Sequence, residues 1–160
     1  MIQALKRSAR PVILAGGGVR LAGATEALAR LAGALQIPVA CTLMGRDSFD
    51  NRSPLWLGMI GTYGSRRANL AVANSDLVLA IGTRLDTRQT GTLPASFARA
   101  ARLIRVDVDG HELARQVKPD ELPVRADAGA FLERLYELAG RIPMDTGPWR
   151  DWLAGCGARL

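Results

Sequence analysis

The chain has 160 residues, of which 48% are hydrophobic and 22% charged, proportions that are ordinary for a soluble globular domain able to bury about 70% of its unfolded surface. Its net charge of +6 would suit a nucleic-acid ligand, but the basic residues are scattered singly apart from Lys6-Arg7 and Arg66-Arg67, so we expect no nucleic-acid partner. No apolar run approaches the ~20 residues of a membrane span, and the run after Pro11 is too short for a signal sequence, so we expect a cytoplasmic protein without membrane contact.

Five short apolar runs, most of them ending at glycine or aspartate, predict buried strands. They cover residues 12–15, 39–41, 77–81, 103–106 and 122–124. Such runs, with little polar alternation, are typical of strands buried on both faces, which occur where crossover helices cover a parallel sheet. We therefore expect an α/β fold with a doubly wound, mostly parallel sheet, and ligands beyond the carboxyl ends of its strands.

Hydrophobic residues at helical spacing predict the helices between these strands. The helix after the first strand is indicated by Leu21, Ala24, Leu28, Leu31 and Leu35. Ser65 is placed to cap a helix over residues 66–73, and Asp127 is placed to cap the last helix, through residues 131–138.

The remaining segments are predicted as connections. Residues 43–64 and 83–93 are expected to be loops, and the first is too long to be a simple connector. A short helix is expected over residues 94–101 and another over 111–116. Residues 141–160 are predicted as an exit linker.

The glycine run at residues 16–18 follows the first strand and precedes a helix. Glycines there let backbone N–H groups approach a phosphate at the helix N-terminus. The dinucleotide fingerprint G-x-G-x-x-G is not met, because Leu21 stands at the third glycine, and the second strand ends at Thr42 without an acid for a ribose hydroxyl. A standard NAD site is therefore disfavoured. A phosphate-binding turn and a tight turn without a ligand both remain open.

A second candidate segment runs from Gly82 to Gly91, after the third predicted strand. If it is extended, Arg84, Asp86 and Arg88 project to one side. Two guanidiniums at the carboxyl end of a strand suit a pyrophosphate, and Asp86 could orient one of them. The alternative is a surface loop whose salt bridges contribute little, and the spacing alone does not decide between the two.

Asp107, Val108 and Asp109 follow the fourth predicted strand. Carboxylates there can accept hydrogen bonds from a ribose, although Asp109-Gly110 equally predicts an ordinary turn. The lone His111 has no partners at metal-ligand spacing, and the two cysteines lie far apart, so no metal site and no disulfide are expected. Without a Ser/His/Asp set or paired carboxylates, no catalytic residue is predicted.

Together these segments resemble the central domain of thiamine-diphosphate-dependent enzymes, most closely that of the acetolactate synthase group. The resemblance covers roughly residues 10–135, with its segments in the expected order and spacing. It is carried by Arg10-Pro-Val-Ile-Leu-Ala-Gly-Gly-Gly18, Ile37-Pro-Val-Ala-Cys-Thr-Leu-Met-Gly45, Leu57-Gly-Met-Ile-Gly61, Ala68-Asn-Leu-Ala-Val72, residues 76–91 and Ile104-Arg-Val-Asp-Val-Asp109. It implies a six-stranded, mostly parallel, doubly wound sheet, a Rossmann-like three-layer sandwich of the FAD/NAD-binding type.

In acetolactate synthases this domain holds an FAD that serves structure rather than redox chemistry. By position, the resemblance implies that the cofactor is lined by Gly16, Gly17, Gly18, Thr42, Leu43, Met44, Gly82, Arg84, Asp86, Arg88, Asp107, Val108 and Asp109. The family's Met-His-Gly is Thr62-Tyr63-Gly64 in this chain, at a place where flavin contacts would lie. Relatives keep the domain with a different nucleotide or none, so FAD and ADP are alternatives.

The resemblance further implies that thiamine diphosphate and Mg²⁺ are bound by two flanking domains of a longer chain, because the activating glutamate and the Gly-Asp-Gly…Asn-Asn motif have no counterpart here. Residues 1–140 would be the central domain, and 141–160 an exit linker or helix whose Trp149 and Trp152 face a missing neighbour. The whole enzyme would decarboxylate a 2-oxo acid, with ligation or protonation of the product, and would form a homo-oligomer, whereas the isolated domain would be inactive. The alternative is a stand-alone nucleotide-binding or regulatory module of the same fold.

Overall fold

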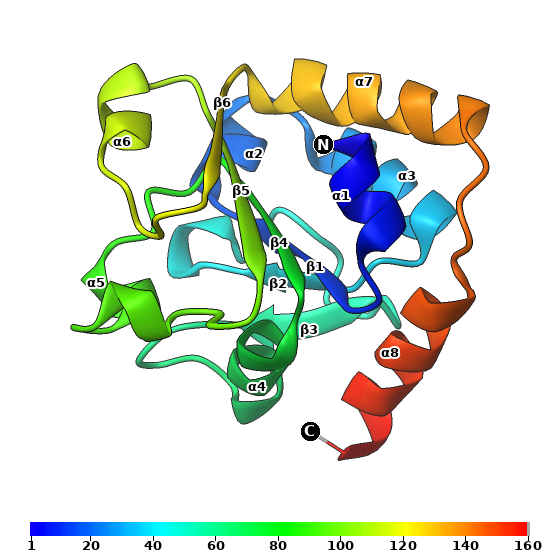
Figure 1. Cartoon of the computed structure of the whole chain (residues 1–160), viewed down its shortest axis with the longest axis horizontal. Coiled ribbons are helices and arrows are strands. Elements are labelled where there is room, and N and C mark those ends of the chain that lie inside the picture. The colour runs from blue at the N-terminus through cyan, green and yellow to red at the C-terminus, as the bar shows by residue number, and fades with distance from the viewer. Residues whose placement is uncertain (160) are drawn as a thin grey trace.

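The computed structural model describes residues 1–159 and the side chains of residues 1–156. Its centre is a sheet of six parallel strands in the order β3-β2-β1-β4-β5-β6 (Figure 1). The strands are β1 (Pro11–Ala15), β2 (Val39–Cys41), β3 (Trp56–Met59), β4 (Leu77–Ile81), β5 (Arg102–Asp107) and β6 (Leu122–Arg125). The chain builds outwards from β1 to β3, then returns and builds outwards on the other side of β1. The predicted doubly wound fold is confirmed, and all six strands are parallel.

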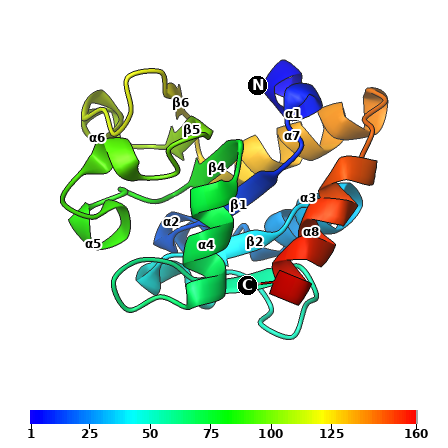
Figure 2. The ribbon, with the colours of Figure 1, turned by 60° about the horizontal axis from the view of Figure 1, so that its bottom comes forward.

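Helices and two 3₁₀ turns connect the strands. The helices are α1 (Ile2–Arg7), α2 (Gly17–Leu21), α3 (Thr25–Leu35), α4 (Arg66–Asn74), α5 (Thr87–Thr90), α6 (Gly110–Ala114), α7 (Ala128–Arg141) and α8 (Gly147–Arg159), and the 3₁₀ turns are η1 (Leu43–Gly45) and η2 (Pro94–Ser96). In Figure 2, α4 crosses in front of the sheet while α3 and α7 lie behind it. None of the helices within residues 1–159 is both long and apolar enough to cross a membrane.

Successive side chains of the central strands enter two separate cores. Ile13 of β1 and Leu79 of β4 belong to the core formed with α1, α3 and α7, whereas Val12 and Val78 belong to the core formed with α4. All four side chains are fully buried, and burying an aliphatic side chain of this size contributes about 1.5–3 kcal/mol. The prediction that these strands are buried on both faces is confirmed.

The two edge strands depart from the prediction. In β6, Pro123 and Arg125 are exposed, so burial on both faces is wrong for this strand, and proline is tolerated because the strand lies at the edge. The strand β3 lies inside residues 43–64, which were predicted as a loop. Its Gly58 has a φ of +111°, and its register against β2 shifts between Val39 and Ala40. The sixth strand implied by the family resemblance is therefore β3.

The single helix predicted after the first strand is two helices. The first, α2, ends before Gly23, whose φ of +63° breaks the helical path. The second, α3, buries Leu28, Leu31 and Leu35 as predicted. Leu21, which the spacing assigned to the same buried stripe, is 81% exposed, because it lies on α2 and is not in register with α3.

Both predicted caps are confirmed, whereas one predicted helix is wrong. The N–H of Ala68 donates to Ser65 Oγ at 3.2 Å, and the N–H of Ala130 donates to Asp127 Oδ1 at 2.9 Å. Residues 94–101 contain only the 3₁₀ turn η2, since the backbone is already extended at the residue that follows it.

The last helix, α8, packs on the domain that precedes it. Trp149 is 1% exposed, and its Nε1–H donates to the carbonyl of Ser8 at 2.7 Å. Cys156 and Trp152 contact the core formed with α4, and Arg67 Nε donates to the carbonyl of Cys156. The expectation that the tryptophans face a missing neighbour is therefore wrong for Trp149, which is buried against this chain's own residues.

Candidate functional site

A cavity of about 620 Å³ opens where β1 and β4 end. The connections after these two neighbouring strands lead to opposite sides of the sheet, so their ends diverge and leave a crevice. Gly17 and Gly18 line the cavity after β1, and Gly82 and Thr83 line it after β4. The volume falls within the range of about 300–1,000 Å³ that is typical of small-molecule sites. The structure thus places a cavity of nucleotide size where the sequence analysis expected a ligand.

The glycine turn is tightly packed against the end of β4. The N–H groups of Gly16 and Gly18 donate to the carbonyls of Ile81 and Gly82, at 2.9 and 3.0 Å. A Cβ at Gly16 would lie 2.1 Å from the Gly82 carbonyl oxygen, and one at Gly18 would lie 2.7 Å from the Gly82 Cα. Glycine is therefore required here for contact between two backbone segments, and two of the amides expected to face a phosphate are bonded to β4 instead. Gly16 itself is not part of the cavity wall.

After β2, the predicted residues divide between the cavity wall and the surface. Thr42 and Met44 line the cavity, whereas Leu43 does not. Gly17 packs closely against this segment, since a Cβ at Gly17 would lie only 3.0 Å from the Met44 carbonyl oxygen. The turn after β1 and the 3₁₀ turn η1 after β2 therefore form one wall of the site.

Arg84, Asp86 and Arg88 would project to one side only if the segment after β4 were extended. The structure shows that it is not extended. Asp86 accepts the N–H of Arg88 at 3.0 Å and caps the one-turn helix α5. Leu85, buried just before this helix, has a φ of +50°, a conformation that is costly for a branched side chain. As a result Arg84 and Asp86 line the cavity and Arg88 does not. Because the helix α5 begins at Thr87, the hypothesis of two guanidiniums on one side of an extended segment is not supported, and only Arg84 of the pair lines the cavity.

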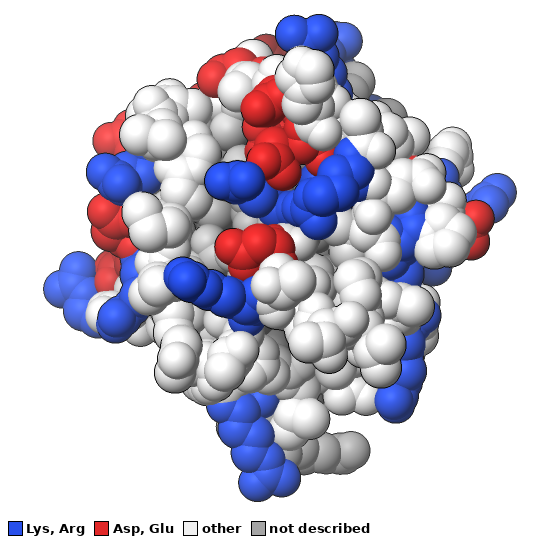
Figure 3. All heavy atoms as spheres, turned by 90° about the vertical axis from the view of Figure 1, so that its left-hand side faces the viewer, with Lys and Arg blue, Asp and Glu red and all other residues white. Residues whose placement is uncertain are grey.

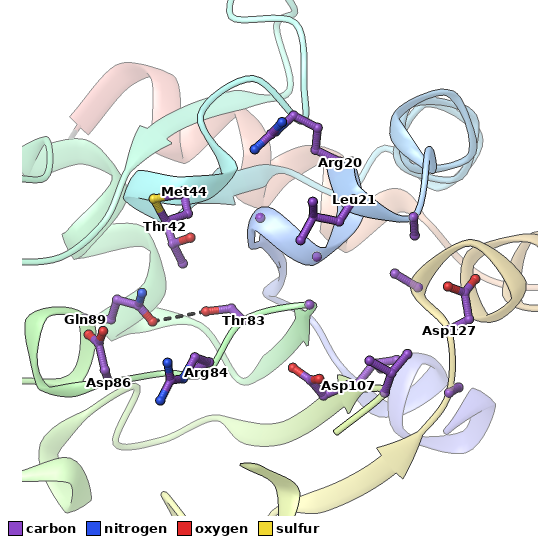
Figure 4. A pocket seen from close by; sticks show the side chains of 18 residues that line it. Arg20, Leu21, Thr42, Met44, Thr83, Arg84, Asp86, Gln89, Asp107 and Asp127 are labelled. Atoms are coloured by element: carbon purple, nitrogen blue, oxygen red, sulfur yellow. Dashed lines mark hydrogen bonds between the residues drawn. The ribbon is translucent and has the colours of Figure 1, made fainter. Parts of the chain in front are cut away.

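A second guanidinium comes from a residue that the sequence analysis missed. Arg20 of α2 lines the cavity, and Figure 4 shows it on the opposite side from Arg84. Arg20 Nε lies 3.1 Å from a carboxylate oxygen of Asp47, and Arg84 Nε lies 2.8 Å from one of Glu112. The only signal in the sequence was the position of Arg20 two residues after the glycine run.

Two carboxylates lie at the other end of the cavity, Asp107 as the last residue of β5 and Asp127 just after β6. Asp107 Oδ1 accepts the N–H of Asp109 at 3.0 Å, and Asp127 Oδ1 caps α7. Asp127 had been predicted only as a cap. Asp109 is not in the cavity wall, since it caps α6 by accepting the N–H of His111 at 2.8 Å.

Apolar side chains complete the wall. Leu21, Met44 and Val108 line the cavity and are all exposed. Thr83 and Gln89 form a hydrogen bond of 3.1 Å on its floor (Figure 4). An apolar wall with a few polar groups is the usual construction of a site for a flat, partly hydrophobic ligand.

Charges of both signs surround this part of the molecule. Figure 3 views the side on which α5 and α6 lie, and there Lys and Arg side chains are next to Asp and Glu side chains. This face does not carry one continuous basic surface of the kind that nucleic-acid binding requires. Ion pairs such as Arg20–Asp47 and Arg84–Glu112 account for part of the mixture.

A metal-binding cluster and an activated cysteine are two features that would indicate catalysis. Within the part of the chain that the structure describes, no three His, Cys, Asp or Glu side chains are grouped to hold a metal ion. Cys41 ends β2, and its burial raises the pKa of the thiol to about 12. The thiol therefore stays protonated and unreactive at neutral pH.

The sequence and the fold were compared with known proteins. A family model described as the central domain of thiamine pyrophosphate enzymes matches residues 1–135. The probable acetolactate synthase large subunit of Methanocaldococcus jannaschii is 43% identical over 149 residues, 93% of this chain and 24% of that protein. The acetolactate synthase isozyme 3 large subunit of Escherichia coli is 34% identical over 155 residues, 94% of this chain and 26% of that protein.

The fold is also similar to that of a solved structure. It is an X-ray structure of a Mycobacterium smegmatis protein assigned as a thiamin diphosphate-dependent enzyme, with a TM-score of 0.71 and 27% identity over 90% of this chain. The chain covers 26% of that structure, and it spans about a quarter of the length of the two acetolactate synthase relatives. This chain belongs to the family of thiamine pyrophosphate enzyme central domains, and its homologues include acetolactate synthase large subunits.

Proposed function

We propose that this chain is the central domain of an acetolactate synthase-like enzyme that acts on a 2-oxo acid. We further propose that its cavity binds an adenine nucleotide that contains a pyrophosphate, either FAD or ADP. The observation that carries the proposal is the cavity between the ends of β1 and β4, which has guanidiniums and carboxylates around an apolar wall. The family match over residues 1–135 and the acetolactate synthase relatives support the rest.

The charges of the cavity match the parts of such a ligand. Arg20 and Arg84 supply cations on opposite sides, where charge-assisted hydrogen bonds to a pyrophosphate are strong. Asp107 and Asp127 each use one carboxylate oxygen in a backbone hydrogen bond, and the second oxygen is suited to a ribose hydroxyl. The exposed apolar wall suits an adenine or flavin ring.

The glycine turn at residues 16–18 is compatible with a nucleotide, although the amides of Gly16 and Gly18 bond to carbonyls at the end of β4. Gly17 has no side chain between the backbone and the cavity, and a Cβ there would already meet Met44. A larger residue at Gly17 would therefore require Met44, which lines the cavity, to move. The residues present therefore fit a nucleotide, with the predicted Arg84 and the unpredicted Arg20 as the two cations of the site.

In the whole enzyme, thiamine diphosphate supplies the electron sink for the decarboxylation of a 2-oxo acid. We propose that flanking domains hold this cofactor and its Mg²⁺, while residues 1–140 provide a scaffold and the nucleotide site. Residues 141–160 would connect this domain to the next, and the whole enzyme would act as a cytoplasmic homo-oligomer. The chain by itself is then expected to be inactive as an enzyme.

Isothermal titration calorimetry tests the proposal on this chain. FAD and ADP are titrated together with NAD, coenzyme A and adenosine. The proposal predicts that FAD or ADP binds more tightly than adenosine, because adenosine lacks the phosphates that Arg20 and Arg84 would hold. Arg88→Ala is the matched control for Arg84→Ala, since it removes a neighbouring arginine that does not line the cavity. If neither FAD nor ADP binds more tightly than adenosine, the proposed pyrophosphate-binding site is refuted.

A separate measurement tests the enzyme assignment. With thiamine diphosphate and Mg²⁺ present, the chain is expected not to consume pyruvate. Consumption of pyruvate by this chain alone would contradict the proposed division of labour between domains. An open reading frame without coding sequence for thiamine-binding domains would support the stand-alone module instead.

A further inference from the structure

Arg84 is held by a side chain that does not itself line the cavity. Its Nε lies 2.8 Å from Glu112 Oε1, on the neighbouring helix α6. The Glu112 side chain is 19% exposed, whereas that of Arg84 is 74% exposed. The ion pair restrains the Nε end of the Arg84 guanidinium, and the largely exposed side chain remains accessible to an anion.

Glu112 is in turn fixed by a buried ion pair. The side chains of Arg105 and Glu121 are 1% and 0% exposed, with Nη1 and Oε1 at 2.8 Å. Arg105 also donates to the carbonyls of Glu112 and Arg115, at 2.8 and 2.7 Å. The Arg105 guanidinium therefore bonds to carbonyls in and just after the last turn of α6, groups that a helix end leaves without intrahelical partners.

The other oxygen of Glu121 fixes the segment that follows α6. It accepts the N–H groups of Val117 and Lys118, at 2.9 and 3.1 Å. With Asp109 capping its first turn, α6 is held at both ends. A helix of five residues is not stable by itself, so these contacts determine where Glu112 lies.

The same network reaches the backbone before α5. Arg115 Nη2 donates to the carbonyl of Arg84 and lies 3.5 Å from that of Leu85, the residue at a φ of +50°. Arg115 Nη2 also lies 3.6 Å from Glu112 Oε2. Both the backbone and the side chain of Arg84 are thus tied to α6.

We propose that Glu112 is a positioning residue of the site: anchored by the buried Arg105–Glu121 pair, it holds Arg84 in the orientation in which it binds the phosphates of a nucleotide. The inference rests on the proposed nucleotide site. An exposed arginine loses side-chain freedom when it binds a ligand, and holding its Nε in advance reduces that loss, as preorganisation does generally. Glu112 therefore raises the affinity for phosphates although it carries a negative charge.

An alternative role for Glu112, neutralising the charge of Arg84, predicts the opposite change in ADP affinity when Glu112 is removed. If Glu112 only neutralised Arg84, its removal would strengthen the attraction of the site for an anion. The proposal predicts instead that Glu112→Ala weakens ADP binding by about five- to tenfold. Glu112→Gln keeps an oxygen that can accept from Nε and is expected to stay within about threefold of the wild type. Glu137→Ala, which removes the acid of an exposed pair on α7, is the matched control.

A double-mutant cycle with ADP is the decisive experiment, with adenosine as the ligand without phosphates. In an Arg84→Ala background, Glu112→Ala should change ADP affinity by less than about twofold, since the group that it positions is gone. Glu112→Ala should leave adenosine affinity unchanged. A second readout is ¹⁵N relaxation of the Arg84 Nε–H group without ligand, which should report a more restrained side chain in the wild type than in Glu112→Ala.

The outcomes separate the two claims. If ADP binds and Glu112→Ala leaves its affinity unchanged or raises it, the positioning role is refuted while the nucleotide site stands. If the wild type binds neither ADP nor FAD, the proposed nucleotide site is refuted and the positioning role with it, even when the Arg84 side chain is restrained. Loss of ADP and adenosine affinity alike in Glu112→Ala would show general damage to the cavity and would also overturn the inference.

Discussion

Removing the acid of the buried Arg105–Glu121 pair should lower stability more than removing any exposed charge. Both side chains are essentially inaccessible to solvent, and the carboxylate also accepts two backbone N–H groups. Glu121→Gln keeps the size and shape of the side chain but leaves the Arg105 charge buried without its counter-ion. Removing one partner of a buried pair typically costs about 3–5 kcal/mol.

That loss is large for a domain of this size. Typical domains are stable by only about 5–15 kcal/mol, and each kcal/mol corresponds to about 2–4 °C in Tm for a chain of this length. Glu121→Gln should therefore lower Tm by about 6–20 °C. The control is Glu137→Gln, which breaks the exposed ion pair with Arg134 and should change stability by less than about 0.5 kcal/mol.

Urea unfolding followed by circular dichroism measures the difference. The expected result is a lower midpoint for Glu121→Gln with an unchanged slope, because the surface exposed on unfolding stays the same. If Glu121→Gln and Glu137→Gln agree to within about 1 kcal/mol, the buried pair is not the anchor that the structure indicates. The inference about α6 and Glu112 would then lose its support.

Three further predictions concern the cavity and its surroundings. Arg84→Ala should weaken ADP binding by about 2 kcal/mol, about thirtyfold, whereas Arg88→Ala should change it by less than twofold; calorimetry measures both, and equal effects would contradict the assigned geometry. Gly16→Ala places a Cβ 2.1 Å from a backbone oxygen and should destabilise the chain by about 1–3 kcal/mol. Gly33→Ala on α3, where the Cβ meets open space, should stabilise the chain by about 0.5–1 kcal/mol. Thermal unfolding compares the two variants, and a neutral Gly16→Ala would show that the turn is looser than described. Burial raises the pKa of the Cys41 thiol from 9.0 to about 12, so iodoacetamide should label this cysteine at pH 8 only after unfolding. Because the pKa is higher in the folded state, the free energy of unfolding should fall as the pH rises from about 9 to about 12. Rapid labelling of the folded chain would refute this prediction.

The interior of the sheet could be predicted because its signal is local. Strands such as β1 and β4 are buried on both faces, so hydrophobic residues follow one another without a break. The edge strand β3 lacks that signal, since it is short and contains Gly58 at a positive φ. Its place came from the family resemblance, which implied a sixth strand.

The site could be predicted only where its residues follow a strand directly. Gly17, Gly82 and Asp107 come at or just after strand ends and line the cavity. Arg20 lines the cavity although it was not predicted, and Arg88 was predicted but does not line it, because each lies on a short helix that no period in the sequence marks. A helix of four or five residues has its direction set by caps and by contacts with distant segments.

The positioning network could not have been found in the sequence at all. Arg84 and Glu112 are 28 residues apart, and Arg105 and Glu121 are 16 apart, and nothing in composition or periodicity connects them. Arg84 and Glu112 meet because the segments after the parallel strands β4 and β5 lie at one edge of the sheet. Arg105 lies within β5 and Glu121 directly precedes β6, and the parallel pairing of these two strands brings them together. Long-range ion pairs of this kind become visible only when the fold is known.

The most direct test of the account is mapping of ADP binding by amide chemical shifts in the ¹⁵N-labelled chain. The account predicts saturable shifts in the turns after β1, β4, β5 and β6, centred on Gly17, Arg84, Asp107 and Asp127, while the amides of α4 stay unchanged. Shifts confined to other surfaces, or no shifts with either ADP or FAD at millimolar concentration, would contradict the assignment of the cavity as a nucleotide site.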